Sequence, residues 1–251
     1  LIAVVKADGY GHGGPEVAQT LAPFTEQFGV ATLNEARAVR VALPDEEILI
    51  LSPCLPEERE AAVREGFIPV VSSAAEAKAY AQLTKVKPVR IHLCIDTGMG
   101  RIGVWQDDAM KTAQEIAAID GIKVESVSTH LPVAESDADF TAQELAGWDK
   151  LVGQLRPILP TAKFHALNSA GSLQRPEHAA DRVRPGLALY GISPLPDFQK
   201  LLRPVMTLKT RITLVRDVGP GRGISYGRDF ITAQPMRIAT LAMGYADGYP
   251  R

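Results

Sequence analysis

LIAVV, residues 1–5, is a short apolar run rich in β-branched residues, the kind that forms a buried strand, and it sets the pattern for most of the chain. Similar runs recur at intervals, and segments with helix signals separate most of them. The other seven runs are FGVATL from Phe28, EILIL from Glu47, FIPVV from Phe67, VRIHLCI from Val89, IKVESVST from Ile122, KFHAL from Lys163 and RVRPGLALYG from Arg182. We therefore expect eight strands that alternate with helices.

The segments between these runs carry recognisable helix starts. Pro56 opens the segment PEEREAAVRE before Gly66, and Ser73 with Glu76 forms a capping box. Because the strand runs are too uniformly apolar to leave one face in water, helices must cover the sheet. The pattern predicts an α/β fold, a closed parallel (β/α)8 TIM-type barrel over residues 1–198. An open doubly wound sheet is the competing interpretation.

A second domain is expected after SPLPDF, residues 193–198, where the helix period stops. From Pro204 the sequence is typical of β-structure, with VMTLKTRITLVRDV, a turn at GPGRG, and the runs ISYG and MRIATLAMGY. We expect a mostly β C-terminal domain over residues 199–251, incomplete without further residues or a partner. Because the sequence opens at Leu1 inside a strand and stops abruptly at Arg251, we expect the native chain to be longer at both ends.

Composition excludes several classes of function. The net charge of -2 comes from 27 basic and 29 acidic residues without a basic stripe, which argues against nucleic acid as a partner. Two cysteines, Cys54 and Cys94, have no metal-binding spacing, so we expect no metal site and a reduced, cytoplasmic setting. No apolar run approaches the roughly 20 residues needed to cross a membrane.

Chemistry-bearing residues stand at the carboxyl ends of the predicted strands, where barrel enzymes build their active sites. These residues are Lys6, Arg101, His130, Asn168, Ser169, Arg184 and Gly186. A lysine in a low-dielectric site has a lowered pKa and can form an imine, which makes Lys6 the candidate nucleophile. An isolated lysine at a barrel mouth more often extends its amine into solvent. The glycine-rich run after Lys6, around Tyr10, suits close approach of the backbone to a ligand.

The run AVVKADGYGHG, residues 3–13, closely resembles the cofactor-lysine motif of alanine racemases. Four further signatures follow in the order of that family, namely DTGMGRIG from Asp96, HALNSAG from His165, RVRPGLALYG from Arg182 and GYADGYPR from Gly244. The resemblance covers nearly the whole chain and implies a barrel followed by a β-domain, pyridoxal 5'-phosphate as cofactor, and head-to-tail homodimers with shared active sites. It also implies an isomerase that interconverts L-alanine and D-alanine and supplies D-alanine for bacterial peptidoglycan.

The resemblance assigns two catalytic bases, Lys6, which holds the cofactor, and Tyr226 from the partner subunit. Two bases are a physical requirement, because racemisation removes a proton from one face of the α-carbon and returns one to the other. His130 resembles the residue that hydrogen-bonds that tyrosine, and Arg101 the residue that faces the cofactor's phenolic oxygen and the substrate carboxylate. Arg184 resembles the donor to the pyridine nitrogen, which a guanidinium leaves unprotonated.

The resemblance also implies where the cofactor phosphate and the substrate entrance lie. The phosphate is expected among Tyr10, Ser169 and the backbone of Gly186 and Leu187, with Asn168 beside them. Tyr245 resembles a tyrosine that lines the entrance to the partner's site.

One position departs from the family pattern. Many members carry a carbamylated lysine where this chain has Cys94, and that carbamate holds the arginine that corresponds to Arg101. Cysteine cannot form the carbamate, so we expect Arg101 to be held by chloride or another anion, by a different side chain, or by water.

Other functions remain open on the sequence alone. They are a racemase of broader or serine specificity, a decarboxylase of the related barrel family, and a pyridoxal-phosphate-binding barrel without turnover. The position of Arg184 in the racemase motif argues against the decarboxylase, and the β-tail with Tyr226 argues against the binding protein.

Overall fold

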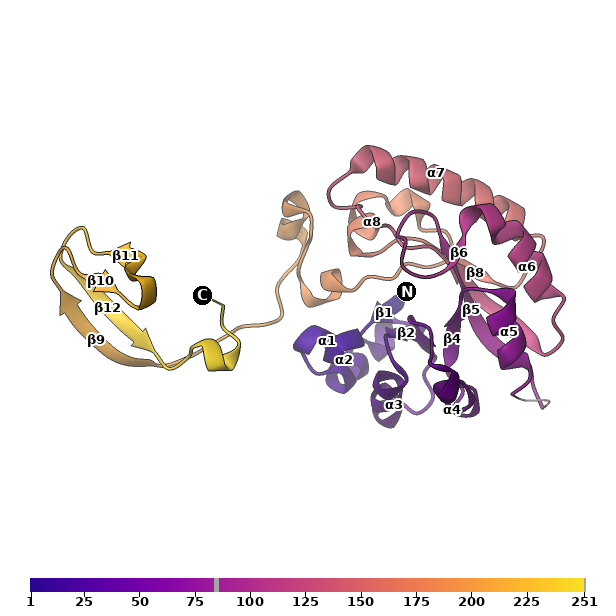
Figure 1. Ribbon diagram of the computed structural model, residues 1–251, viewed down its shortest axis with the longest axis horizontal. Coiled ribbons are helices and arrows are strands. Elements are labelled where there is room, and N and C mark those ends of the chain that lie inside the picture. Colours follow the sequence, from indigo (N-terminus) through magenta and orange to yellow (C-terminus); the bar gives the residue numbers. More distant parts are fainter. Residues whose placement is uncertain (84–85, 251) are drawn as a thin grey trace. The chain divides into compact units, whose positions relative to one another are not determined.

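The computed structural model describes residues 1–83 and 86–250, and these form two compact units, Leu1–Val205 and Met206–Arg251 (Figure 1). The predicted division between residues 198 and 199 remains a prediction. Within the described residues, no helix is long and apolar enough to pass through a bilayer.

The first unit is built on a curved sheet of parallel strands that follow one another in chain order (Figure 1). The strands of this path are β1 (Ile2–Val4), β2 (Gln27–Val30), β3 (Ile48–Ile50), β4 (Ile68–Val71), β5 (Val89–Asp96), β7 (Ile122–Ser128) and β8 (Lys163–His165). A two-residue strand, β6 (Val104–Trp105), pairs with the end of β5. Seven predicted strands are therefore confirmed, and their sequential order is that of a barrel.

The prediction of an eighth strand from Arg182 is wrong, because this segment forms no strand. The segment nevertheless closes the ring of strands. Ile2 and Val4 of β1 donate backbone hydrogen bonds to the carbonyls of Val183 and Pro185, at 2.9 and 3.2 Å. On the other side, Arg184 N–H donates to the carbonyl of Leu167 at 2.9 Å. This extended segment thus lies between β8 and β1. Pro185 has no N–H to donate, so a regular ladder cannot continue through it.

Helices follow the strands and lie on the outside of the sheet, α3, α4, α5, α6 and α7 being prominent in Figure 1. They are α2 (Gly14–Leu21), α3 (Leu33–Ala42), α4 (Arg59–Arg64), α5 (Ala74–Ala81), α6 (Ala109–Ala117), α7 (Ala138–Leu155) and α8 (Ser169–Gln174). The predicted cap before α5 is confirmed at Ser73, whose Oγ accepts from Glu76 N–H at 3.1 Å. The returning bond of a capping box is displaced by one residue, since Glu76 Oε2 accepts from the N–H of Ser72 at 2.6 Å. Short 3-10 turns complete this unit at Ala22–Phe24, Pro56–Glu58, Gln106–Asp108, Pro176–His178, Leu187–Tyr190 and Pro196–Leu201.

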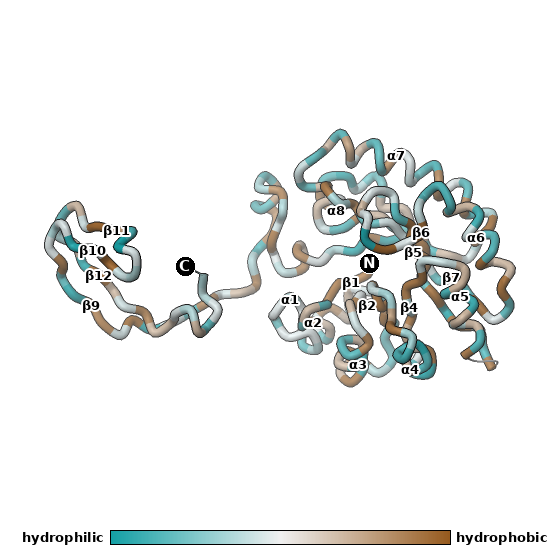
Figure 2. Tube along the Cα trace, in the orientation of Figure 1, coloured by the Kyte–Doolittle hydropathy of each residue, from teal (hydrophilic) through white to brown (hydrophobic). Residues whose placement is uncertain are grey.

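Alternation along the strands divides the side chains between the helices and the barrel interior. Ile91, Leu93 and Ile95 of β5 join the large outer core with α5, α6 and α7, whereas His92 and Cys94 point the other way, toward the interior. In Figure 2 the helices alternate between hydrophilic and hydrophobic colours, as expected for helices with one buried face. The interior is apolar beside β1, β3 and β4 but polar beside β5, β7 and β8.

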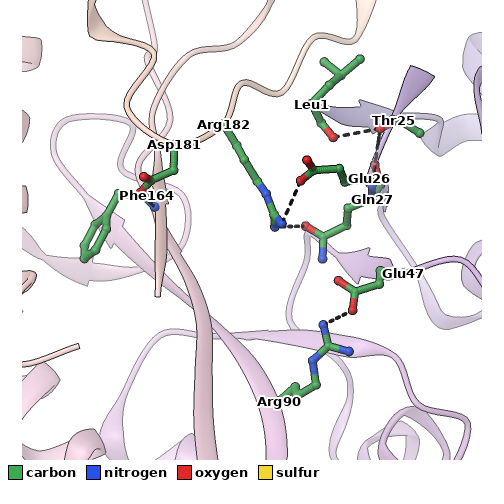
Figure 3. A network of polar contacts seen from close by, with 9 residues as sticks. All are labelled: Leu1, Thr25, Glu26, Gln27, Glu47, Arg90, Phe164, Asp181 and Arg182. Carbon is green, nitrogen blue, oxygen red and sulfur yellow. Dashed lines mark hydrogen bonds and ion pairs between the residues drawn. The ribbon is translucent and has the colours of Figure 1, made fainter. Parts of the chain in front are cut away.

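The amino ends of the strands carry a network of ion pairs (Figure 3). Arg90, near the start of β5, pairs with Glu47 before β3, and its Nε lies 3.0 Å from Glu125 Oε2 of β7. Arg182 Nη2 lies 3.2 Å from Glu26 Oε2 beside β2. The Arg90–Glu125 pair joins the neighbouring strands β5 and β7, whereas the pairs made by Glu47 and Glu26 each reach across an intervening strand. All lie at the end of the barrel that carries stability in this fold.

The second unit is β-structure, as predicted, and its strands pair in antiparallel fashion. Its main pair is β9 (Ile212–Val218) with β12 (Met236–Leu241), and a second pair joins β10 (Gly223–Ile224) to β11 (Phe230–Ile231). Two 3-10 turns, Tyr226–Arg228 and Tyr245–Asp247, complete it. Large apolar side chains on these strands are exposed, among them Ile212, Leu214, Phe230 and Leu241.

Candidate active site

A cavity of about 490 Å³ opens at the carboxyl ends of the barrel strands. Parallel strands bring these ends together, so residues far apart in the sequence meet there. The cavity is lined by nine of the predicted site residues, which are Lys6, Tyr10, Arg101, His130, Asn168, Ser169, Arg184, Gly186 and Leu187. Tyr226 and Tyr245 belong to the second unit, where each opens a 3-10 turn and each is exposed. Their roles remain predictions.

Lys6 is separated from the end of β1 by Val5 and opens α1 (Lys6–Gly11), which is a left-handed turn. Residues 7–10 have φ values of 52°, 53°, 62° and 55°, and only Gly9 among them lacks the steric penalty of that region. Glu35 of α3 supports the turn, because its Oε1 accepts from Ala7 N–H at 3.0 Å. Asp8 Oδ1 accepts from Gly14 N–H at 2.7 Å and ties the turn to α2. Strain held in this way places the backbone next to Lys6 in one conformation.

Arg184 is buried against the barrel interior and bonds uncharged acceptors. Its Nη1 contacts the ring of His165 and donates to the His165 carbonyl at 3.0 Å, and its Nη2 donates to the carbonyls of Thr129 and Ala166. Burial, with a smaller effect of Arg101, lowers the pKa of Arg184 to about 10, so it stays charged at neutral pH. No carboxylate in residues 1–83 or 86–250 forms an ion pair with it. A buried cation without an acid partner suits a ligand that brings an acceptor.

Three histidines around Arg184 are neutral at pH 7. Burial, and then the charge of Arg184, lowers the pKa of His92 and of His130 to about 3 and that of His165 well below its usual value. His92 stacks on His165 with ring centroids 5.1 Å apart and bonds the hydroxyls of Ser126 and Ser128 at 2.7 and 2.8 Å. Neither His92 nor His165 was predicted as a site residue, although they lie in the runs VRIHLCI and HALNSAG.

The loop that carries Arg101 is held by a buried carboxylate. Asp96 Oδ1 accepts from the N–H groups of Gly98 and Gly100 at 2.9 and 3.1 Å, and Oδ2 accepts from Arg101 N–H at 3.2 Å. Charge-assisted bonds of this kind define one loop conformation. The Arg101 guanidinium forms no ion pair within the described part of the chain. Burial raises the pKa of the neighbouring Cys94 thiol to about 11, so Cys94 supplies no negative charge.

Hydroxyl donors gather on the opposite side of the cavity. Ser169 Oγ accepts from the N–H groups of Gly186 and Ala188 at 2.9 and 3.2 Å, which leaves its own hydrogen free to donate. The Tyr10 hydroxyl lies against Gly186, where a Cβ atom would overlap it. Burial raises the pKa of Tyr10, so this hydroxyl is also a donor. The arrangement suits an anion such as a phosphate.

Asn168 lines the same cavity but its side chain has structural partners. Its Oδ1 accepts from Gly171 N–H at 3.0 Å as the N-cap of α8, and its Nδ2 donates to the Leu131 carbonyl at 3.1 Å. The predicted contact of Asn168 with the cofactor therefore competes with its role as a cap.

Comparison with known proteins gives a consistent result over both units. The sequence matches the family model for the alanine racemase N-terminal domain over residues 1–194 and that for the C-terminal domain over residues 205–251. The alanine racemase of Halothermothrix orenii is 38% identical over 263 residues, which span all of this chain and 68% of that protein. The alanine racemase of Azoarcus sp. is also 38% identical and is covered to 70%.

Solved structures give the same likeness in three dimensions. The biosynthetic alanine racemase from Pseudomonas aeruginosa has a TM-score of 0.89 and 32% identity, over all of this chain and 70% of that one. The alanine racemase from Bartonella henselae with covalently bound pyridoxal phosphate has a TM-score of 0.83 and 28% identity, with the same coverage.

Proposed function

This chain belongs to the alanine racemase family, and from that membership we propose that it interconverts L-alanine and D-alanine by a two-base mechanism, with Lys6 and the partner subunit's Tyr226 as the bases. The observation that carries the proposal is the meeting of Lys6, Arg101 and Arg184 in one cavity at the carboxyl ends of the strands. Lys6 offers an amine for the cofactor and for proton transfer, Arg101 a cation for the substrate carboxylate, and Arg184 a cation for the ring nitrogen of the cofactor.

Pyridoxal 5'-phosphate fits the residues of this cavity. The buried Arg184 guanidinium offers its charge to a neutral ring nitrogen, and the hydroxyls of Tyr10 and Ser169 offer donors to a phosphate. Lys6 offers an amine to which the cofactor can be attached, and the alanine racemase from Bartonella henselae was solved with covalently bound pyridoxal phosphate. When bound, the cofactor withdraws electrons from the α-carbon of the substrate and so makes the α-hydrogen acidic.

The chain's own residues then handle the proton and the substrate. Lys6 Nζ removes or returns the proton on one face of the α-carbon, and the phenolic oxygen of the partner subunit's Tyr226 does so on the other. His130, held neutral by burial and by the cations around it, hydrogen-bonds that tyrosine. Arg101 orients the substrate carboxylate, and Arg184 keeps its own proton because a guanidinium is a very weak acid.

The proposal extends to assembly and cellular role. We propose a head-to-tail homodimer in which each active site takes Tyr226 and Tyr245 from the partner, and the exposed apolar side chains of the second unit support such an interface. The D-alanine product serves bacterial peptidoglycan. Free thiols at Cys54 and Cys94 accord with a cytoplasmic location.

The test combines the cofactor's visible absorbance with conversion of L-alanine to D-alanine. Lys6→Ala should lose both, whereas Tyr226→Phe should keep the absorbance and lose roughly 100-fold or more in rate. Tyr249→Phe, another exposed tyrosine of the second unit, is the matched control. A wild-type protein that binds the cofactor but converts no alanine, or a Tyr226→Phe variant with full activity, would contradict the proposal. A panel that includes serine distinguishes alanine specificity from a broader racemase.

A further inference from the structure

Behind the cavity, a buried carboxyl on α7 connects the two loops that carry the cations. Glu144 is 7% exposed, and its Oε1 accepts a hydrogen bond from the Thr97 hydroxyl, next to the loop of Arg101. The Thr97 hydroxyl lies 2.6 Å from the hydroxyl of Thr129, which is fully buried. The Thr129 carbonyl in turn accepts from Arg184 Nη2. A continuous line of hydrogen bonds and backbone therefore runs from α7 to Arg184.

α7 also packs directly against the Arg101 loop. A Cβ atom on Gly98 would lie 3.1 Å from Phe140 Cζ and 3.6 Å from Glu144 Oε1, so the glycine backbone sits against both side chains. Gly98 N–H donates to Asp96, as do the N–H groups of Gly100 and Arg101. Asp96 thus holds the Arg101 loop through the loop's own N–H groups, whereas Glu144 holds the start of the loop, at Thr97, against α7.

The burial of Glu144 is costly for a carboxyl. Its Oε2 is buried and makes no hydrogen bond in the described part of the chain. Burial, together with the nearby charge of Asp96, raises the pKa of Glu144 and favours its neutral form. An apolar side chain of similar size would pack here without an unpaired oxygen. What Glu144 provides, and an apolar side chain cannot, is an acceptor for the Thr97 hydroxyl.

The charges that face the cavity explain why the Arg101 loop needs an anchor. Arg101 and Arg184 carry like charges, and the effect of Arg101 on the pKa of Arg184 shows that they repel each other. Arg184 is held by four contacts, but the Arg101 side chain has no ion pair within residues 1–83 and 86–250. The position of Arg101 therefore depends on how firmly its loop is anchored.

We propose that Glu144 is a positioning residue, which acts through Thr97 and Thr129 to hold the Arg101 loop at a set place relative to Arg184. It touches neither substrate nor cofactor. Its expected effect is on substrate binding, which rests on the proposed function because Arg101 is taken to orient the substrate carboxylate.

The first test measures amide hydrogen exchange in the Arg101 loop, which needs neither cofactor nor activity. Thr97→Val removes the hydroxyl and keeps the shape, and Glu144→Leu removes the acceptor. Each should speed exchange at Gly98, Gly100 and Arg101 by about tenfold, the effect of losing one hydrogen bond. Thr97→Ser keeps the hydroxyl and Glu144→Gln keeps an acceptor, so both should stay within about threefold of wild type.

A double variant separates this mechanism from general loosening of the fold. If the two side chains act as one unit, Thr97→Val combined with Glu144→Leu should exchange no faster than the more affected single variant. Additive effects would overturn the proposal. So would unchanged loop exchange in Thr97→Val and Glu144→Leu, or equal acceleration throughout α7 and β7.

The second test is kinetic. Thr97→Val should raise the KM for alanine by about five- to tenfold with kcat within about threefold, and Thr97→Ser should restore it. A fall in kcat at constant KM would overturn the positioning role. If the wild-type protein racemises no alanine, the proposed function fails, but the exchange measurements still decide whether Glu144 anchors the loop.

Discussion

Glu35 offers a direct test of whether the left-handed turn after Lys6 needs support from outside. Its two carboxylate oxygens bond different loops, since Oε1 accepts from Ala7 N–H at 3.0 Å and Oε2 from Ala31 N–H at 2.7 Å. The perturbation is Glu35→Ala, which removes both acceptors and leaves the N-cap of α3, Thr32, in place. The turn then has to be held by Asp8, by the His12 ring, whose Nδ1 lies 3.1 Å from the carbonyls of Gly9 and Tyr10, and by backbone bonds.

The expected loss can be estimated from these contacts. A hydrogen bond to a charged group contributes roughly 1.5–3 kcal/mol when buried, and Glu35 is only half-buried, so we take about 1–1.5 kcal/mol for each bond. The total is about 2–3 kcal/mol. The three non-glycine residues in the left-handed region cost roughly 1–2 kcal/mol each, or roughly 3–6 kcal/mol together, so Glu35 offsets about half of this strain. For a unit of this size, Tm should fall by roughly 4–12 °C.

Thermal unfolding monitored by circular dichroism measures this shift. Glu115→Ala is the control, because Glu115 is an exposed carboxylate on α6. Cofactor absorbance should weaken in Glu35→Ala even well below Tm, since the residue next to Lys6 loses its anchor. A Glu35→Ala protein that unfolds within about 1 °C of the Glu115→Ala control would refute the view that Glu35 holds the turn in place.

Three further outcomes follow from the cavity. Gly186→Ala brings a methyl group into the Tyr10 hydroxyl, so it should destabilise the protein by about 1–3 kcal/mol and weaken cofactor binding. Gly147→Ala, on an open helix face, should do neither, and equal Tm values for the two variants would contradict this. Replacing chloride by gluconate should raise the KM for alanine several-fold, because within the described residues neither Cys94 nor an ion pair neutralises Arg101. An unchanged KM would exclude a chloride ion beside Arg101. The free energy of unfolding should be highest above pH 6.5 and should fall as the pH drops toward 3, because His92, His130 and His165 are protonated near pH 6.5 in the unfolded chain but stay neutral in the folded one. Equal urea unfolding midpoints at pH 7 and pH 5 would contradict this.

Local sequence was a good guide to the strands and a poor one to how the sheet ends. Runs such as VRIHLCI became β5 because β-branched and apolar residues favour a buried strand wherever it lies. The run from Arg182 is also apolar, but it contains Pro185, which has no N–H to donate, and it closes the ring without forming a strand. The spacing of Gly9, Gly11 and Gly14 also matches the glycine pattern of a dinucleotide-binding sheet, so the open alternative was not excluded by sequence. The hydrogen bonds of Ile2 and Val4 to the segment before Gly186 decide for closure.

The residues of the cavity also divide into those that local sequence could predict and those that it could not. The meeting of Lys6, Arg101, His130 and Arg184 in one cavity could be predicted, because each stands where a predicted strand ends and such ends come together in a barrel. Glu35 had a local signal, because it stands three residues after Thr32, the spacing typical of a helix start, although nothing linked it to the turn after Lys6. Glu144 had no signal, because a glutamate in a helix looks the same whether it faces water or a buried threonine.

The order of the strands, the polar residue at each strand end and the family were readable from the sequence itself, because residue type and alternation act over a few neighbouring positions. The tertiary structure alone decided the closure at Val183 and Pro185, the left-handed turn after Lys6, the neutral histidines and the contact between Glu144 and Thr97. Each of these depends on burial or on a partner tens of residues away, and no local pattern records the distance between such groups.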